Sequence, residues 1–316
     1  MVVQGISLNL GAGAARGFAH IGVMRALLEH KIPFHRIIGV SMGALVGSIY
    51  SIEPDIRFVE ERLLDLVASK AFQESLIANY YKTTKTEDLN FFQKIGNWYS
   101  KTGMLGRVLI GPGMLTKEEI ETVLDPYLPN ANIAYTRFPF SCVAVELERG
   151  VPLIFSKGSM RTLVTASMSM PMVFPPVAYG KGHLVDGGVL DKIGILGAKE
   201  LGFKKIIAVD VSNMDFPVSM IKSGIDVMLR AEEIASYHRR VGQLKMASVV
   251  IQPIEGNIHW ADYSKCKELI EIGYEKTISM MEEIKAALGL LSPIKRFFFW
   301  QKQKPKKDGA ISYLLI

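Results

Sequence analysis

The chain alternates short apolar runs with longer segments whose apolar residues recur every three or four positions. Residues 4–10 form a short run typical of a buried strand, and residues 18–30 carry apolar side chains at helical spacing. Residues 36–40 form a second apolar run, and an apolar helical segment follows it to Tyr50. The start of the chain therefore predicts two successive units of strand, turn and helix.

The second half of the chain repeats this alternation. Residues 137–146 and 151–156 are predicted to be two strands joined by a hairpin. The further predicted elements are helices over 160–168, 194–201, 218–245 and 261–288, and strands at 183–186, 205–211 and 248–252. Strands that alternate with helices predict a three-layer α/β/α fold, in which helices cover both faces of a mainly parallel central sheet.

Residues 51–130 break the alternation. The segment is rich in predicted helix, with strong periodicity over 56–70 and a capping box at Thr116 and Glu119 that predicts a helix to Leu124. Clustered aromatic residues and several glycines lie between these helices. Two interpretations remain open: a helical cap or lid inserted over a site, or a helical excursion packed on the sheet edge. Under the first, residues 1–290 form one catalytic domain with a cap at about 51–130.

The second strand runs directly into Gly39-Val40-Ser41-Met42-Gly43, and a helix follows. This order of strand, tight turn and helix is the context in which Gly-x-Ser-x-Gly forms a nucleophile elbow. Side chains at Gly39 and Gly43 are expected to collide with the neighbouring helix and strand. Ser41 would lie at the apex, above the N-terminus of a helix that favours developing negative charge. Short strings of this kind also arise by chance, so the motif alone does not establish catalysis.

A loop of very small residues, Gly11 to Gly17, follows the first strand and contains one charged residue, Arg16. Such a loop can bring backbone N–H groups close to an anion. A dinucleotide-binding turn is disfavoured, because Arg16 occupies the place of its third glycine. In a parallel sheet this loop and the Ser41 turn emerge at the same edge. That arrangement suits an oxyanion hole beside a nucleophile.

A third motif, Asp186-Gly187-Gly188, follows a proline-rich stretch over residues 169–176. Its three prolines exclude both helix and central strand, so a rigid loop is expected there. In isolation an Asp-Gly pair is more often a plain hairpin turn. Beside the other two motifs, Asp186 is the candidate partner of Ser41.

Taken together, the Arg-Gly loop, the Gly-x-Ser-x-Gly elbow and the distant Asp-Gly-Gly resemble the patatin-like phospholipase family. The resemblance is close over residues 11–47 and 167–211 and loose between them. It implies a serine acyl hydrolase that cleaves lipid acyl esters with a Ser41–Asp186 dyad and without histidine. The residues implied for the oxyanion hole and substrate binding are Gly11, Gly13, Ala14, Ala15, Arg16 and Gly17. The implied glycines of the elbow and of the aspartate turn are Gly39, Gly43, Gly187 and Gly188.

The sequence departs from the family pattern at Ala12 and Ala14, where family members usually carry glycine. A positive φ at either alanine would strain the oxyanion loop. Arg16 is expected either to bind an anionic group of the substrate or to brace the loop, with bracing slightly favoured.

Two other functions stay open. A conventional Ser-His-Asp esterase needs a histidine after the acid, and His259 is its best candidate, since His238 lies in a predicted charged helix. His20 and His183 are expected to be structural or to point away from Asp186. A lipid- or membrane-binding module that kept the fold and lost the chemistry is the third interpretation. The substrate, its head group and the oligomeric state are not readable from the sequence.

Composition narrows these choices. The chain has 316 residues, 49% of them hydrophobic, which is enough for one large core. It has no apolar run of transmembrane length, and its first residues lack a basic segment, so a cleavable leader is not expected there. Cys142 and Cys266 lie far apart and show no metal-ligand spacing, so no disulfide framework, metal or cofactor is expected. A cytoplasmic location is the resulting expectation.

The net charge of +6 is concentrated at the C-terminal end. Residues 292–316 carry six basic residues and one acid, a net +5, which leaves +1 for the body and no basis for nucleic-acid binding. This tail also holds Phe297-Phe298-Phe299-Trp300 among its basic residues. Aromatic residues among lysines suit the headgroup interface, which predicts peripheral membrane contact. The alternative is an arm that packs on the body or on a partner.

Overall fold

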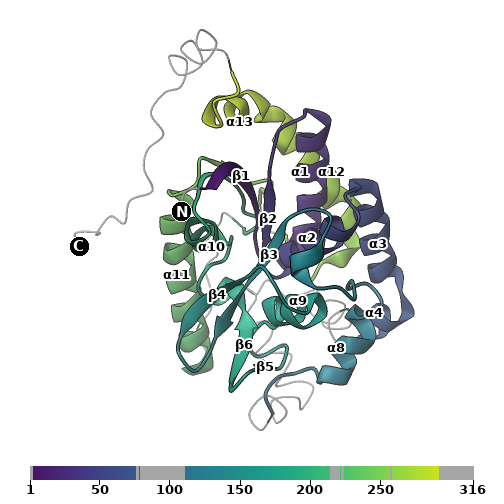
Figure 1. The fold of residues 1–316 in the computed structure, drawn as a ribbon. Coiled ribbons are helices and arrows are strands. Elements are labelled where there is room, and N and C mark those ends of the chain that lie inside the picture. Colours follow the sequence, from purple (N-terminus) through teal and green to yellow (C-terminus); the bar gives the residue numbers. More distant parts are fainter. Residues whose placement is uncertain are drawn as a thin grey trace, which may run out of the picture.

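The computed structural model describes residues 3–75, 78, 111–213, 221, 224–256 and 258–291. These residues form a twisted sheet between two layers of helices (Figure 1). The predicted three-layer α/β/α architecture is confirmed. Among the described residues, no helix has the length and apolar character needed to cross a bilayer.

Eight strands are described in the sheet. They are β1 (Val3–Leu10), β2 (Arg36–Gly39), β3 (Phe140–Glu146), β4 (Val151–Phe155), β5 (Val177–Tyr179), β6 (Gly182–Asp186), β7 (Phe203–Val209) and β8 (Val249–Ile251). Their order is β5-β6-β3-β2-β1-β7-β8, and β4 also pairs with β3. The pairs that join β8, β7, β1, β2 and β3 are parallel, whereas β4, β5 and β6 add antiparallel pairs. The sheet is therefore mainly parallel, as predicted, with an antiparallel end at β3.

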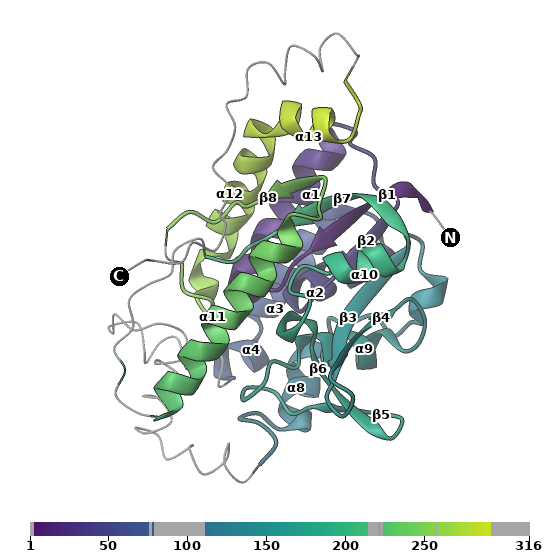
Figure 2. The same ribbon diagram turned by 90° about the vertical axis from the view of Figure 1, so that its left-hand side faces the viewer.

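Helices cover both faces of this sheet. The described helices are α1 (Ala19–Glu29), α2 (Met42–Ile52), α3 (Ile56–Ala68), α4 (Lys70–Glu74), α8 (Lys117–Leu124), α9 (Met160–Met168), α10 (Ile195–Glu200), α11 (Gly224–Leu244), α12 (Cys266–Ser279) and α13 (Met281–Ala287). α10 and α11 lie on one side of the sheet, and α1, α2, α3 and α12 lie on the other (Figures 1 and 2).

The helix predicted over 261–288 is in fact two helices, α12 and α13. The break is at Met280, where φ is −97° and ψ is 2°, outside the helical range. Its N–H is shared between the carbonyl oxygens of Lys276 and Thr277, each 3.2 Å away. The helix thus tightens and stops at this residue, although the apolar periodicity continues through it.

Side chains along β1 point alternately to the two faces of the sheet, so the strand contacts both helical layers. Leu8 and Leu10 point into the cluster that includes α1 and α2. Ser7 and Asn9 are fully buried on the opposite face. The Ser7 hydroxyl donates to Asn9 Oδ1 at 2.8 Å, and Asn9 Nδ2 donates to the Gly194 carbonyl at 2.6 Å. Because both polar side chains are paired, their burial is tolerated and ties β1 to the start of α10.

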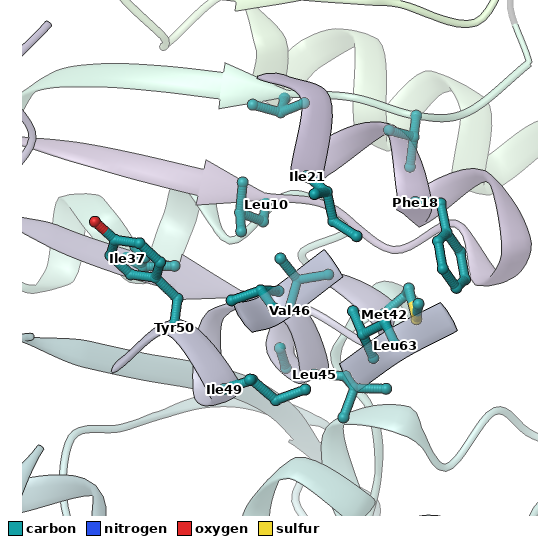
Figure 3. Packing of buried hydrophobic residues seen from close by; sticks show 14 of the residues in the cluster. Leu10, Phe18, Ile21, Ile37, Met42, Leu45, Val46, Ile49, Tyr50 and Leu63 are labelled. Atoms are coloured by element: carbon teal, nitrogen blue, oxygen red, sulfur yellow. The ribbon is translucent and has the colours of Figure 1, made fainter. Parts of the chain in front are cut away.

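The larger core lies between the sheet and α1, α2 and α3. Figure 3 shows its centre, where side chains from the strands meet those of the helices. The labelled residues are Leu10, Phe18, Ile21, Ile37, Met42, Leu45, Val46, Ile49, Tyr50 and Leu63, all of them buried. α2 is apolar on nearly every side, which is typical of a helix enclosed by its neighbours. Its N-terminus is therefore held rigidly beneath Ser41.

The described helices of the segment 51–130 pack on the body. Val59, Leu63 and Leu66 of α3 are buried in the large core, and α3 contacts both α1 and α2. The capping box at Thr116 is present and begins α8 as predicted. Most of the rest of the segment, residues 79–110, and the tail from residue 292 lie outside the described residues. The cap and the membrane-contacting tail stay predictions.

Candidate active site

Ser41 occupies a strained turn between β2 and α2. Its φ is 54° and its ψ is −122°, a conformation that is rare for a residue with a side chain. A methyl group at Gly43 would lie 2.0 Å from the Leu10 carbonyl oxygen, and one at Gly39 would lie 2.4 Å from the Ala44 Cα. The predicted collisions with strand and helix are thus real, and both glycines are required for the turn.

The pairing of β3 explains why Asp186 reaches this turn. Along one edge of β3, residues Cys142 to Glu146 pair with β4. On the other edge, Cys142 pairs with Gly39 of β2, and Ala144 pairs with Asp186 of the antiparallel β6. β2 and β6 therefore share one edge and approach each other end to end, about 7 Å apart along β3. Ser41 and Asp186 lie in the gap between the two strand ends.

Within this gap the Ser41 side chain adjoins the Asp186 carboxylate and lowers its pKa as a hydrogen-bonding neighbour. Asp186 is only 5% exposed. The pKa of its carboxyl is raised to about 6, because the effect of burial is larger than the effects that oppose it. The opposing effects are hydrogen bonding by Ser41, the hydrogen bond from the Gly188 N–H at 2.7 Å and the charge of Lys192. A carboxylate with this pKa is ionised at neutral pH and is a stronger base than a solvated aspartate.

Two serines that the sequence did not single out hold the backbone of both residues. The Ser41 N–H donates to Ser167 Oγ at 3.0 Å, and that hydroxyl donates to the Val143 carbonyl at 2.7 Å. The Asp186 N–H donates to the Ser169 carbonyl at 2.9 Å. The end of α9 thus fixes the elbow and the aspartate strand together. In the sequence, the only hint of this role is that two serines lie just before the prolines, and this pattern does not say which residues they bind.

The small-residue loop lies between the other two motifs. A methyl group at Gly17 would lie 2.3 Å from Met42 Cγ, next to Ser41. One at Gly188 would lie 3.3 Å from the Ala12 Cβ. The three sequence-predicted segments therefore converge on one edge of the sheet, and the loop contacts both the elbow and the aspartate turn.

Most backbone N–H groups of the loop already have a hydrogen-bond acceptor, which leaves few of them to bind an oxyanion. The Ala15 N–H, an expected oxyanion donor, instead donates to the Trp260 carbonyl at 2.8 Å. The N–H groups of Gly11, Ala12 and Arg16 are also engaged, with carbonyl acceptors at 3.1, 2.9 and 3.1 Å. The N–H groups of Gly13 and Ala14, where the 3-10 helix Ala14–Phe18 begins, have no acceptor among the described residues.

The backbone of Ala14 and the side chain of Arg16 can be compared with what the sequence predicts for them. Ala14 has φ 48°, so one of the two alanines that replace a family glycine is indeed strained, while Ala12 is not in this region. Arg16 Nε donates to the Gly13 carbonyl at 3.4 Å, a contact that braces the loop. Among the described residues, the other two guanidinium nitrogens of Arg16 have no hydrogen-bond acceptor.

No histidine is hydrogen-bonded to Ser41 among the described residues. His259 Nδ1 accepts the Ala261 N–H at 3.1 Å, in the loop whose Trp260 carbonyl contacts Ala15. His20 is fully buried, and its Nε2 lies 2.8 Å from the Gly11 carbonyl oxygen. Burial lowers the pKa of His20 to about 4, so its imidazole is neutral at pH 7. The same described residues contain no group of His, Cys, Asp and Glu suited to a metal ion.

Comparison with known proteins adds the family context. The sequence model described as patatin-like phospholipase matches residues 8–199 of this chain. A lysophospholipase, NTE1, of Debaryomyces hansenii is 24% identical over 295 residues, 85% of this chain and 17% of that protein. A putative patatin-like phospholipase domain-containing protein of Caenorhabditis elegans is 26% identical, covering 98% of this chain and 29% of that protein.

A third relative is the neuropathy target esterase sws of Drosophila melanogaster, 31% identical over 66% of this chain and 13% of that protein. The chain thus spans less than a third of the length of each of these relatives. Among solved structures, VipD from Legionella pneumophila aligns with a TM-score of 0.46 and 13% identity, over 89% of this chain and 67% of that chain.

Proposed function

Because the chain belongs to the patatin-like phospholipase family, we propose that it is a serine acyl hydrolase that cleaves lipid acyl esters through a Ser41–Asp186 dyad. The observation that carries this proposal is that Ser41, in a strained elbow, adjoins the buried carboxylate of Asp186 and acts on its pKa. The names of the relatives, a lysophospholipase and a neuropathy target esterase, support an ester of a lipid as the substrate.

In the proposed mechanism, Ser41 Oγ attacks the ester carbonyl and Asp186 accepts its proton. The carbonyl oxygen becomes an oxyanion, which the N–H groups of Gly13 and Ala14 stabilise. Removal of one such donor typically costs about 2.7–4 kcal/mol of activation free energy. Protonated Asp186 then gives its proton to the leaving alkoxide, which leaves an acyl group on Ser41. A water molecule, deprotonated by Asp186, releases the acid and restores the enzyme.

A lipid panel tests the proposal directly. Wild type, Ser41→Ala and Asp186→Asn are assayed on a lysophospholipid, a diacyl phospholipid, a monoacylglycerol and a soluble ester. We expect at least one lipid ester to be hydrolysed by wild type, and each variant to lose about 10³-fold or more in kcat, since the two groups act as a unit. Asp186→Asn activity close to that of wild type would refute the dyad.

The same assay discriminates the two rival functions. If His259 completed a triad, His259→Ala would lose as much activity as Ser41→Ala, whereas the dyad leaves this variant active. A fluorophosphonate probe decides between an enzyme and a binding module, because it labels only an activated serine. We expect it to label Ser41 in the folded protein, and labelling that is absent or confined to other residues would favour the module.

A further inference from the structure

His20 contacts the small-residue loop from the first turn of α1. The side chain is fully buried, and its Nε2 lies 2.8 Å from the carbonyl oxygen of Gly11, nine positions earlier in the chain. A methyl group at Gly17 would lie 3.6 Å from the Cδ2 atom of the same ring. The imidazole therefore lies against both the first and the last residue of the loop.

The contact with Gly11 fixes which ring nitrogen of His20 carries the proton. A carbonyl oxygen can only accept a hydrogen bond, so Nε2 must be the donor. Burial lowers the pKa of His20 to about 4, opposed by the Gly11 carbonyl and the charge of Asp210, so the ring holds one proton at pH 7. Nδ1 is then unprotonated, and it has no partner among the described residues. A buried nitrogen without a partner is unfavourable, which indicates that the position keeps histidine for its Nε2–H.

The peptide group between Gly11 and Ala12 is held at both of its polar atoms. Its carbonyl oxygen accepts from His20, and its N–H donates to the Lys192 carbonyl at 2.9 Å. In the part of the chain that the structure describes, no backbone N–H donates to the Gly11 oxygen, so His20 is its donor. The next peptide group carries the Gly13 N–H, one of the two donors proposed for the oxyanion. With the preceding peptide fixed, only the backbone angles of Ala12 set the direction of that N–H.

The far side of the two proposed donors is held as well. The Gly13 carbonyl accepts the Arg16 N–H at 3.1 Å, and this carbonyl belongs to the peptide group that carries the Ala14 N–H. A methyl group at Gly13 would lie 2.3 Å from Val211 Cγ2, so the loop also packs closely on the segment after β7. The two donors thus lie between anchored carbonyls at Gly11 and Gly13, and only the first of these depends on a side chain of α1.

Close packing of α1 keeps the His20 ring in place. A methyl group at Gly22 would lie 1.8 Å from the Ile270 carbonyl oxygen, and one at Gly273 would lie 2.1 Å from the Ala19 carbonyl oxygen. The backbones of α1 and α12 therefore touch at these two glycines. An oxyanion hole is effective because its donors are fixed before the reaction, and a ring on a tightly packed helix supplies such a fixed point.

We propose that His20 is a positioning residue of the oxyanion hole, whose Nε2–H holds the Gly11 carbonyl and so directs the Gly13 N–H toward the oxyanion. The proposal rests on the proposed acyl hydrolase function. His20 acts through the backbone and does not touch the ester. Because the oxyanion forms only as the ester is attacked, misdirection of the Gly13 N–H should lower kcat and leave KM nearly unchanged.

The test compares side chains that place a donor at different distances from the backbone. Wild type, His20→Gln, His20→Asn and His20→Leu are assayed on a soluble ester at pH 7. The amide nitrogen of glutamine reaches the place of Nε2, that of asparagine reaches only the place of Nδ1, and leucine has no donor. Outright removal of an oxyanion donor typically costs about 10²- to 10³-fold in kcat, so we expect His20→Asn and His20→Leu to lose about 10- to 100-fold and His20→Gln to recover most of that loss.

His35→Leu is the matched control. His35 Nδ1 accepts the Ile6 N–H at 3.0 Å, so this variant also removes a hydrogen bond between a histidine and the backbone of β1, but away from the loop. We expect its kcat to equal that of wild type. The midpoint of thermal unfolding is measured for every variant. If His20→Leu fails to fold, His20→Gln and His20→Asn still decide the question, because they carry the same amide and differ by one methylene group.

Nuclear magnetic resonance of the imidazole nitrogens gives a readout that does not depend on activity. We expect the ¹⁵N chemical shifts of His20 in the free protein to show a protonated Nε2 and an unprotonated Nδ1 at pH 7. The opposite tautomer would leave the Gly11 carbonyl without its donor and would overturn the proposal.

The kinetic outcomes separate this proposal from the acyl hydrolase function. An unchanged kcat in His20→Leu, equal losses in His20→Gln and His20→Asn, or a loss that appears in KM alone would overturn the positioning role and leave the acyl hydrolase standing. A wild type that hydrolyses no ester would overturn the acyl hydrolase and the positioning role with it.

Discussion

At the scale of single residues, the site contains backbone strain and a buried carboxylate, and hydrogen bonds offset part of their cost in free energy. Ser41 has a positive φ and Ala14 has another, and such conformations cost about 1–3 kcal/mol each. Asp186 is buried with a pKa of about 6, so its ionised form is also unfavourable in isolation. The hydrogen bonds from the Ser41 N–H to Ser167 Oγ and from the Gly188 N–H to Asp186 Oδ1 offset part of these costs and hold the two groups of the proposed dyad in one geometry.

The pH dependence of activity follows from the buried Asp186. The proposed base works only when ionised, and burial raises its pKa to about 6. We therefore expect kcat/KM for a soluble ester to fall tenfold per pH unit below about pH 6 and to level off above it. The acidic limb should persist in His259→Ala. A limb near pH 4 would show that Asp186 is not desolvated, and its loss in His259→Ala would assign it to histidine.

Ser167 is the positioning residue whose loss should be most informative. Ser167→Ala leaves the Ser41 N–H and the Val143 carbonyl without their partners, at 3.0 and 2.7 Å. We expect the free energy of unfolding to drop by about 1–3 kcal/mol and kcat to fall with little change in KM. Ser169→Ala is the matched control, because Ser169 bonds Asp186 through its carbonyl, and that bond survives the change. Similar kcat values for both variants would contradict a positioning role for the Ser167 hydroxyl.

At the scale of elements, β3 is the organising strand. It pairs with β2, β6 and β4, and so it fixes the distance between the strand that ends in the elbow and the strand that ends in Asp186. A shift of β6 by one residue along β3 would turn Asp186 to the opposite face of the sheet. The geometry of the proposed dyad is thus set by strand register more than by the loops.

The capping box of α8 offers an element-scale prediction about the segment 51–130. Thr116 Oγ1 accepts the Glu119 N–H at 3.3 Å, and Glu119 Oε2 accepts the Thr116 N–H at 2.7 Å. Thr116→Ala should lower the free energy of unfolding by about 1 kcal/mol, measured by urea denaturation. Thr122→Ala, at an exposed position within the same helix, should have little effect. An unchanged midpoint for Thr116→Ala would mean that α8 unfolds separately from the sheet, as a distinct cap would.

At the scale of the whole molecule, charge is divided between a near-neutral body and a basic tail. The tail over 292–316 carries six basic residues and four consecutive aromatic ones. Each basic residue near an anionic lipid surface contributes about 1 kcal/mol. Deletion of 292–316 should therefore weaken co-sedimentation with anionic vesicles, while hydrolysis of a soluble ester is retained.

Two controls make the tail experiment specific. Vesicles of neutral lipid measure the contribution of the aromatic residues alone, and a tail with its six basic residues changed to glutamine separates charge from aromatic content. Equal binding of the intact and shortened chains to anionic vesicles would remove the tail from membrane recognition and favour an arm that packs on protein.

The sequence by itself determined the local features of this protein. The strand, turn and helix around Ser41, the glycines at 39 and 43, the capping box and the alternation of strands and helices could all be predicted, because they depend on sterics and periodicity within a few residues. The position of the small-residue loop beside the Ser41 turn was also predictable, since the carboxyl ends of parallel strands share one edge of a sheet. That rule does not place Asp186, because β6 runs antiparallel to β3.

Only the tertiary structure decided which groups are free to act. Ser41 and Ser167 are 126 positions apart, and the Ala15 N–H is occupied by the carbonyl of Trp260, so neither contact leaves a local signal. The raised pKa of Asp186 and the lowered pKa values of Lys192 and Arg16 depend on burial among distant segments. Local sequence sets the conformation of a turn, but hydrogen-bond partners and solvation are set by whatever the fold brings alongside it.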